Sequence, residues 1–377
     1  MKRHPLAALL ICAIFPTLIM TASAQSSERL HRPATAHDAA PAPLHKWAVV
    51  LHGGAGVIER SSMSPEAEKQ YRDGLNQAIT AAGDVLNKGG SAMDAVEAAI
   101  EVMEDNPLFN AGRGAVFAAN GTNQMDAAIM DGATMRAGAV ADVQYTKNPI
   151  ALARAVMEKT QFVMLSGTGA DEFSLQAGLQ QERRSYFFTE SRWDSLLREL
   201  RKENLPIPPR PPGTPLPPAN QRALAAPPVF SEAPGDRHYG TVGVVALDTH
   251  GNIAAGTSTG GLTAKRWDRI GDSPIIGAGT YASNESCAVS GTGIGEYFIR
   301  YTVTRTICAL VQYRHMRLQA AADEVIQKQL APIHGDGGVI AITPDGQIAW
   351  SFNTPGMFRA KLREDGKPEI AIYHDEP

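Results

Sequence analysis

Apolar residues along the chain gather in segments that predict both strands and helices. Trp47–Leu51 is a continuous apolar run, which is typical of a buried strand. Two helices are predicted next, over Ser64–Asn87 and Ser91–Glu104, because each opens on a serine that can cap a helix N-terminus. Pro65 then takes the first helical position, where its missing N–H costs no hydrogen bond. This part of the chain therefore predicts a strand followed by two helices.

The remaining periodic segments are also of both types. Further helices are predicted at 149–159, 191–203, 295–312 and 323–329. Further strands are predicted at 124–130, 137–143, 162–165, 241–248, 253–258, 288–290, 338–343 and 347–351. The glycine-rich segments His52–Gly56 and Asn110–Gly114 are expected to be turns. Strands cluster at both ends of the chain and helices lie between them, so we expect sheets covered by helices in an α/β fold.

Composition excludes some classes of function. A chain of 377 residues with 44% hydrophobic content can bury a full core, as one large domain or two. The net charge of −4 gives no basic surface, so nucleic acid is not an expected partner. The His52–Gly56 segment has no lysine of the kind that accompanies a phosphate-binding loop, so phosphate binding is not supported.

The first 24 residues have the pattern of a signal peptide. Lys2, Arg3 and His4 supply a basic start, Pro5–Met20 an apolar run, and Ala22–Ala24 a small-residue cleavage site. An uncleaved membrane anchor is the weaker alternative, because the run is short and contains a proline. The sequence therefore predicts an exported, periplasmic protein with no membrane span once the signal is removed.

Cysteine and histidine patterns give no sign of a metal enzyme. The chain has no CxxC, no HExxH and no His/Cys cluster at metal-ligand spacing, so no catalytic cofactor is expected. Cys12 leaves with the predicted signal. Cys287 and Cys308 could pair in an oxidising compartment, but we favour two buried free thiols, one in a strand and one in a helix.

A proline-rich stretch leads directly to the candidate nucleophile. Residues 205–234 are dominated by proline, with alanine and polar residues between, so they are expected to be extended or disordered. The stretch ends at Gly240-Thr241, where a buried strand is predicted to begin. If the peptide bond after Gly240 is cut, Thr241 gains an α-amine with a reference pKa of about 7.7–8.0. Threonine with a terminal amine is a nucleophile and its base in one residue.

Three further motifs suit hydrolysis of a small amino-acid amide. In Arg269–Pro274, the Arg269 guanidinium can bind a carboxylate and Asp272 can bind an α-ammonium group. In Gly291–Glu296, a hydroxyl and a backbone N–H follow each other at Thr292-Gly293 and could form an oxyanion hole. Thr257–Gly261 carries Thr259, whose hydroxyl could orient that of Thr241.

Each motif also has an ordinary explanation when taken alone. A Gly-Thr pair at a strand start is common turn chemistry, and an Arg and an Asp three residues apart often form a loop salt bridge. A glycine-rich turn can be no more than a helix N-terminus, and Thr259 an ordinary strand threonine. The order of the motifs, closed by Asn353–Met357, favours the hydrolase.

Several segments in order resemble the plant-type L-asparaginase / isoaspartyl aminopeptidase family of N-terminal-nucleophile hydrolases. The resemblance covers most of the chain except residues 1–24 and 170–237. The matching segments are Val49–Gly56 (VVLHGGAG), Pro107–Ala118 (PLFNAGRGAVFA), Met130–Val143 (MDGATMRAGAVADV), Gly240–Asp248 (GTVGVVALD), Gly251–Gly261 (GNIAAGTSTGG), Arg269–Ala282 (RIGDSPIIGAGTYA), Ser290–Arg300 (SGTGIGEYFIR) and Asn353–Met357 (NTPGM).

The resemblance implies a fold and a subunit organisation. The fold would be a four-layer αββα sandwich. Self-cleavage between Gly240 and Thr241 would leave an α subunit of residues 25–240, with a linker over about 170–240, and a β subunit of residues 241–377. Both subunits would form one domain, and two such α/β pairs would form a dimer.

The resemblance also assigns roles to particular residues. Thr241 would be the nucleophile, supported by Thr259, and Asn110 would lie beside it and help hold the scissile bond or the substrate. The remaining implied site residues are the oxyanion hole of Thr292 and Gly293 and the substrate-binding Arg269, Asp272, Thr292, Gly293 and Gly295. A structural sodium ion is implied on the main-chain carbonyls of Met103, Glu104, Asn106, Phe109, Ala111 and Arg113.

The implied reaction is hydrolysis of L-asparagine and β-aspartyl (isoaspartyl) dipeptides, which releases aspartate. Glycosylasparaginase shares the fold and nucleophile, but that branch usually has Asp-Thr at the junction. A third alternative is a periplasmic amino-acid-binding protein that never matures. The sequence departs from the family's common pattern at Gly291, at Ile294 and in Lys265–Asp268, which bears on substrate preference.

Overall fold

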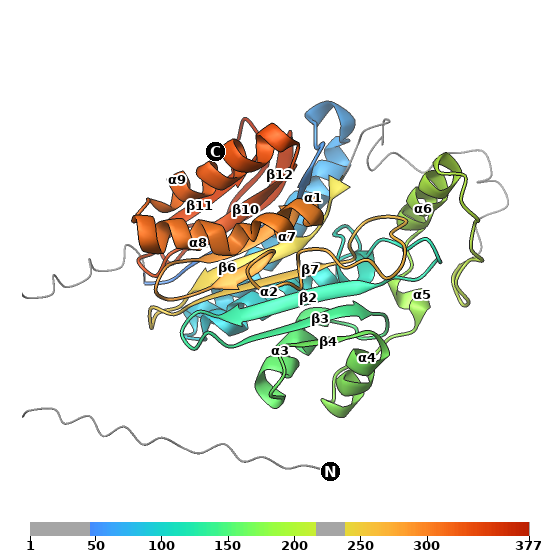
Figure 1. Cartoon of the computed structure of the whole chain (residues 1–377), viewed down its shortest axis with the longest axis horizontal. Helices are drawn as coiled ribbons and strands as arrows, with labels where there is room; N and C mark the ends of the chain where they lie inside the picture. Colours follow the sequence, from blue (N-terminus) through green and yellow to red (C-terminus); the bar gives the residue numbers. More distant parts are fainter. Residues whose placement is uncertain (1–45, 216–237, 377) are drawn as a thin grey trace, which may run out of the picture. The chain divides into compact units, whose positions relative to one another are not determined.

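The computed structural model describes residues 46–215 and 238–376 (Figure 1). The predicted signal peptide and much of the proline-rich stretch lie outside these residues. All described residues fall in one compact unit, which spans Ala42–Pro377. Two β-sheets with helices packed against them make up this unit, as the distribution of strand and helix patterns predicts.

The larger sheet brings the N-terminal strand next to the strand that follows Thr241. Its order is β13-β12-β1-β6-β7-β2-β3-β4, and β5 also pairs with β1. All neighbours are antiparallel except β3 and β4. The strands are β1 (Ala48–Gly56), β2 (Met125–Asp131), β3 (Ala137–Val143), β4 (Met164–Ser166), β5 (His238–Tyr239), β6 (Val242–Leu247), β7 (Ile253–Thr259), β12 (Gly356–Arg363) and β13 (Glu369–Tyr373).

The smaller sheet is fully antiparallel, in the order β11-β10-β9-β8. Its strands are β8 (Thr280–Ala282), β9 (Ala288–Gly293), β10 (Gly337–Ile342) and β11 (Ile348–Phe352). It faces the larger sheet, since β9 and β10 contact β6 and β1. Val50, Val245, Val289 and Val339 from the two sheets share one fully buried apolar cluster. Each such side chain contributes about 1.5–3 kcal/mol when it is removed from water.

Helices cover the outer faces of the sheets. The larger sheet packs against α1 (Pro65–Asn87), α2 (Ala92–Glu104) and α3 (Pro149–Lys159), and the smaller one against α8 (Val303–Arg314) and α9 (Leu318–Asp323) (Figure 1). The other helices are α4 (Gly167–Gln176), α5 (Arg184–Phe187), α6 (Glu190–Lys202) and α7 (Gly295–Tyr301). None of the helices in the described ranges has the length and apolar character needed to cross a bilayer.

The predicted helix starts at Ser64 and Ser91 are confirmed. The Ser64 hydroxyl accepts from the Ala67 N–H at 3.1 Å. Ser91 forms a capping box with Asp94, in which the side chain of each residue accepts from the backbone N–H of the other. These caps satisfy N–H groups that a helix leaves without partners at its first turn.

One secondary-structure prediction is wrong, and two predicted helices differ in detail. His52–Gly56 is not a turn but the end of β1, held by β6 and β5 on one side and β12 on the other. Its glycines permit close packing: a Cβ on Gly53 would lie 2.6 Å from Phe109. The segment 295–312 is mostly helical, as predicted, with a break at Thr302, whose φ is 44°. The helix predicted at 323–329 is also present, as the π-helical continuation of α9 over Glu324–Leu330. Strands β12 and β13 were not predicted from the sequence.

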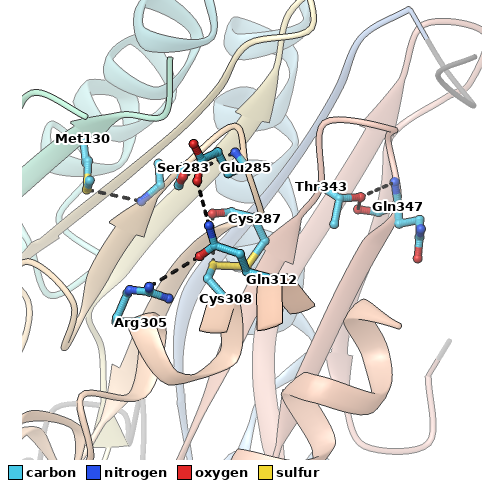
Figure 2. Close-up of a disulfide and its surroundings, with 10 residues drawn as sticks. Met130, Ser283, Glu285, Cys287, Arg305, Cys308, Gln312, Thr343 and Gln347 are labelled. Atoms are coloured by element: carbon cyan, nitrogen blue, oxygen red, sulfur yellow. Dashed lines mark hydrogen bonds between the residues drawn. A yellow bond between two sulfur atoms is a disulfide. The ribbon is translucent and has the colours of Figure 1, made fainter. Parts of the chain in front are cut away.

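The preference for free thiols is also wrong, because Cys287 and Cys308 form a disulfide (Figure 2). The two Cα atoms are 5.3 Å apart, within the usual range for a bridge. Cys287 immediately precedes β9 and Cys308 lies in α8, and both are fully buried. Their pairing follows from the packing of α8 against β9, a long-range contact that spacing in the sequence does not reveal.

We expect the disulfide to stabilise the fold by about 3 kcal/mol, because it closes a loop with a sequence separation of 21 residues. The double variant Cys287→Ala/Cys308→Ala should lose a free energy of unfolding of this size in urea titrations. A reducing agent should destabilise the wild type and leave the variant unchanged. Equal unfolding midpoints for the two proteins would contradict the prediction.

Candidate active site

The peptide bond between Gly240 and Thr241 lies at an interruption of the β-ladder. Strands β5 and β6 both pair with β1, as Tyr239 opposite Ala55 and Gly243 opposite His52. Gly240 and Thr241 belong to neither strand. The chain is therefore held on both sides of this bond, while the bond itself is free of the ladder.

Polar contacts hold the two residues of this bond. The Asn110 N–H donates to the Gly240 carbonyl at 3.2 Å. The Thr241 hydroxyl is buried and lies 3.0 Å from the Thr259 hydroxyl, to which it donates. The predicted nucleophile and its predicted supporting residue are thus in direct contact, because β6 and β7 are neighbours in the sheet.

Asn110 is fixed by its own hydrogen bonds. Its side-chain oxygen accepts from the Val116 N–H at 2.9 Å, and its side-chain nitrogen donates to the Gly261 carbonyl at 2.8 Å. Its carbonyl accepts from the Gly260 N–H at 3.0 Å. A Cβ on Gly240 would lie 2.6 Å from the Asn110 Cβ, which explains why glycine precedes Thr241. Asn110 therefore lies beside the junction, as the resemblance implies.

One cleft brings most of the predicted site residues together. Its lining residues are Thr241, Thr259, Gly261, Leu262, Arg269, Gly271, Asp272, Ser273 and Gly293. Gly295 lies at the same place, because a Cβ on it would be 2.7 Å from an Arg269 nitrogen and 3.0 Å from Asp272 Oδ1. Thr292 is fully buried in β9, next to the lining residue Gly293. Asn110 and Gly240 line a second cavity with the β1 glycines and Arg192.

Asp272 is a buried carboxyl group with an unused oxygen. Its Oδ2 has no hydrogen-bond partner among the described residues. Burial raises the pKa of Asp272 from its ordinary value of 3.8 to about 7, although its own backbone N–H and the Arg269 charge act in the opposite direction. The charged form of such a carboxyl group is stabilised most when a cation enters the cleft and pairs with it.

Arg269 is held by Glu296, a residue that was not predicted from the sequence to belong to the site. Glu296, in the first turn of α7, accepts from Arg269 Nε at 2.9 Å and from an Nη at 3.0 Å. This two-point contact fixes the plane of the guanidinium. Glu296 is the last residue of the Gly291–Glu296 motif, so the sequence did point to this region. Its contact with Arg269, 27 residues away, depends on the fold.

The unusual segment Lys265–Asp268 directly precedes Arg269 and has a strained backbone. Trp267 and Asp268 have left-handed backbones, with φ of 56° and 52°, which is costly for residues with side chains. Lys265 is buried and donates to the Gln124 carbonyl at 2.8 Å, 3.9 Å from the Asp126 carboxylate. Trp267 is 89% exposed. The segment thus combines a buried lysine with an almost fully exposed indole side chain.

The six residues of the implied sodium site lie on the C-terminal end of α2 and on the loop after it. Gly112, with φ of 50°, packs so closely on the Glu104 carbonyl that a Cβ would be 2.4 Å from its oxygen. Gly114 similarly packs on the Phe109 carbonyl. The loop therefore folds back so that its glycines pack against two of the six carbonyls, those of Glu104 and Phe109. Main-chain oxygens are of the donor type that hard cations prefer. Among residues 46–215 and 238–376, no group of three or more His, Cys, Asp or Glu side chains is arranged to hold a metal ion.

Comparison with known proteins places the chain in a family. A family model described as Asparaginase matches residues 45–372. Isoaspartyl peptidase of Escherichia coli (strain K12) is 41% identical over 335 residues, which covers 88% of this chain and 98% of that protein. Isoaspartyl peptidase/L-asparaginase of Xenopus laevis is 37% identical, over 88% of this chain and 96% of that protein. Plant-type L-asparaginase of Pyrococcus abyssi (strain GE5 / Orsay) is 38% identical, over 86% and 99% respectively.

These matches include both sheets and the whole cleft. The class is that of amidohydrolases, enzymes that split amide bonds with water. The chain belongs to the asparaginase family whose members include the isoaspartyl peptidases and plant-type asparaginases.

The raised pKa of Asp272 predicts how stability depends on pH. A carboxyl with a higher pKa in the folded state binds more protons when folded, so its contribution to stability falls as pH rises from about 4 to about 7. Asp272→Asn removes this cost. Its free energy of unfolding relative to the wild type should increase over that window and level off above it. Urea titrations from pH 4 to pH 9 measure the difference, and a constant difference would contradict the raised pKa.

Proposed function

We propose that this protein is a self-cleaving N-terminal threonine hydrolase of L-asparagine and β-aspartyl (isoaspartyl) dipeptides. The observation that supports this most strongly is the geometry of the Gly240–Thr241 peptide bond, which lies at an interruption of the ladder. The Thr241 hydroxyl is hydrogen-bonded to that of Thr259, and the neighbouring Gly240 carbonyl accepts a hydrogen bond from the Asn110 N–H. The cleft beside it holds Arg269 and Asp272, which suit the two charged groups of an amino-acid head.

Maturation begins with attack within the chain. The Thr241 oxygen bonds to the Gly240 carbonyl carbon, and the C–N bond of the peptide breaks. The hydroxyl proton is transferred to the leaving nitrogen, so an ester and a free amine result. Negative charge that develops on the carbonyl oxygen is stabilised by the Asn110 N–H. Water then splits the ester, which leaves Gly240 as a carboxylate and Thr241 as a new N-terminus.

Turnover repeats this chemistry on the substrate. The free α-amine, with a reference pKa of about 7.7–8.0, takes the hydroxyl proton as the Thr241 oxygen attacks the side-chain acyl carbon. The Thr292 hydroxyl and the Gly293 N–H stabilise the tetrahedral oxyanion, an interaction of about 3–4 kcal/mol per donor. The proton passes to the departing amine. Water releases aspartate from the aspartyl ester and regenerates the threonine.

Recognition of the substrate uses the charges already in the cleft. The α-carboxylate binds Arg269, and the α-ammonium binds the unused oxygen of Asp272, with Gly295 leaving room for both. Glu296 keeps the guanidinium in plane for this contact. An ammonium ion beside Asp272 favours the charged carboxylate, so substrate binding relieves the cost of burying it.

The structural sodium ion is a separate proposal. The main-chain carbonyls of Met103, Glu104, Asn106, Phe109, Ala111 and Arg113 would hold it, and a hard monovalent cation suits an all-oxygen donor set. Its role would be to fix the loop that carries Asn110. We expect the thermal midpoint in sodium chloride to exceed that in choline chloride at equal ionic strength. Equal midpoints would contradict the site.

Architecture, location and assembly complete the proposal. We describe the fold as the four-layer αββα sandwich of N-terminal-nucleophile hydrolases, on the basis of two facing sheets with helices on their outer sides. Export to the periplasm is supported by the pattern of residues 2–24 and by a disulfide, which persists in oxidising compartments. Assembly into a dimer of α/β pairs rests on the resemblance alone, and light scattering of the processed protein tests it.

The two alternative functions are less well supported. Glycosylasparaginase is disfavoured by glycine rather than aspartate before Thr241. A binding protein that never matures does not account for an N–H donated to the carbonyl of the bond to be cut. Release of aspartate from β-aspartyl dipeptides, with none from N-acetylglucosaminyl-asparagine, separates the three.

Thr241→Ala should abolish both maturation and turnover, because it removes the only oxygen that attacks in either step. We expect the variant to run as one polypeptide on denaturing gels and to lose aspartate release by roughly 10⁴-fold or more. The wild type should run as two fragments. Thr241→Ser is the control, since it keeps the hydroxyl and should retain cleavage. Two fragments from Thr241→Ala would contradict the mechanism.

A further inference from the structure

A buried histidine contacts the main chain of the nucleophile. His52 lies in β1, fully buried between the two sheets. Its Nδ1 is 3.0 Å from the Thr241 carbonyl oxygen, and its Nε2 is 3.0 Å from the Ser290 hydroxyl in β9. The proposed chemistry at Thr241 uses neither contact, so their role needs a separate account.

The protons on this histidine can be assigned from its partners. A carbonyl oxygen only accepts, so Nδ1 carries the hydrogen. Burial lowers the pKa of His52 to about 3, although the bond to Thr241 acts in the opposite direction, so the ring is neutral near pH 7. A neutral ring with a protonated Nδ1 has an accepting Nε2. The Ser290 hydroxyl must therefore donate to Nε2.

Three hydroxyls behind His52 are ordered by the single proton that each can donate. Because Ser290 donates its single proton to His52, its 2.7 Å contact with Thr257 requires Thr257 to donate. Thr280 in turn lies 2.7 Å from Thr257 and donates to it. Thr280 is also 3.1 Å from the carbonyl of Ser273, the residue after Asp272. Each threonine can also share its hydrogen with a carbonyl, Thr257 with that of Gly279 at 3.2 Å and Thr280 with that of Ser273. Along the shorter hydroxyl contacts of 2.7 Å, each donor points toward the Thr241 carbonyl, an arrangement in which each bond strengthens the next.

The backbone next to His52 and Ser290 leaves no space for a further side chain. Gly243 lies opposite His52 in the ladder. A Cβ on Gly243 would lie 1.9 Å from the Ser290 oxygen and 2.4 Å from His52 Nε2. Any side chain there would displace the histidine or the serine. Glycine as the second residue of β6, a residue type that ordinarily weakens a strand, is explained by this contact.

We propose that His52 is a positioning residue that holds the mature N-terminus through the Thr241 carbonyl, backed by the hydroxyls of Ser290, Thr257 and Thr280. This inference rests on the proposed function. The Thr241 carbonyl precedes the first residue of β6, so the ladder does not hold it. Once the chain is cut, no residue precedes Thr241, and chain ends fray unless they are tied down. The bond from His52 then fixes the direction in which the α-amine and the hydroxyl face the cleft.

The test compares two substitutions of His52 whose side chains have the same number of heavy atoms and the same branching. His52→Asn keeps an N–H donor near the position of Nδ1, and His52→Leu removes it. Steady-state hydrolysis of a β-aspartyl dipeptide is measured per mole of processed β fragment, so that altered maturation does not enter kcat. We expect His52→Leu to lower kcat by about 30- to 100-fold with KM within about threefold of wild type, since small misplacement of a reacting group has effects of this size. The kcat of His52→Asn should exceed that of His52→Leu by at least about tenfold.

A second pair covers the case in which His52→Leu does not fold. Thr257→Val removes the hydroxyl that donates to Ser290 and should lower kcat by about three- to tenfold at unchanged KM. Thr304→Val makes the same change at a buried threonine on α8, whose hydroxyl has no partner in the described part of the chain, and should leave kcat unchanged.

The outcomes separate the inference from the function it rests on. If the wild type hydrolyses the dipeptide and His52→Leu keeps kcat within threefold, the positioning role is overturned and the function stands. Equal kcat losses for His52→Asn and His52→Leu, or for Thr257→Val and Thr304→Val, also overturn it. A processed wild type that hydrolyses neither asparagine nor β-aspartyl dipeptides overturns the proposed function, and the inference with it.

Discussion

The structure depends on how β1 holds the chain on either side of one peptide bond. Strands β5 and β6 pair with it, while Gly240 and Thr241 lie between them. The bond is fixed at both ends, yet its carbonyl accepts from the Asn110 N–H rather than from a ladder partner. The proposed nucleophile, which uses its own amine as base, needs this situation, because the bond must be rigid before it breaks and the residue must stay rigid afterwards.

The charges of the cleft suit the substrate that we propose, which brings opposite charges. Asp272 is buried with one oxygen unused, and Arg269 is kept in plane by Glu296. Burying a carboxyl group costs free energy, as its raised pKa shows. A zwitterionic amino-acid head removes this cost and gains two charge-assisted contacts. Under the proposed function the cleft is therefore less stable by itself than with substrate, which is common at sites built for binding rather than for folding.

Much of the fold and the site could be predicted from local chemistry. Helix starts at Ser64 and Ser91 depend on a cap within a few residues, and the structure confirms them. Thr241, Thr259, Arg269 and Asp272 were selected by residue type and order, and the cleft brings them together. The features that escaped prediction depend on distant contacts. The sequence of His52–Gly56 predicts a glycine turn, but the segment is part of a strand paired on both sides. Its glycine at position 53 allows close packing against Phe109 and Phe358. The Cys287–Cys308 bridge and the Glu296–Arg269 contact likewise exist only once α8 and α7 have packed.

The most direct test of the account is to find where the acyl group resides during turnover. Processed protein is mixed with a β-aspartyl dipeptide, quenched in acid within the first turnover, and examined by mass spectrometry of its fragments. The account predicts an aspartyl group on the fragment that begins at Thr241, attached to the side chain of that first residue. An aspartyl group on any other residue, or on a chain still unbroken after Gly240, would contradict it.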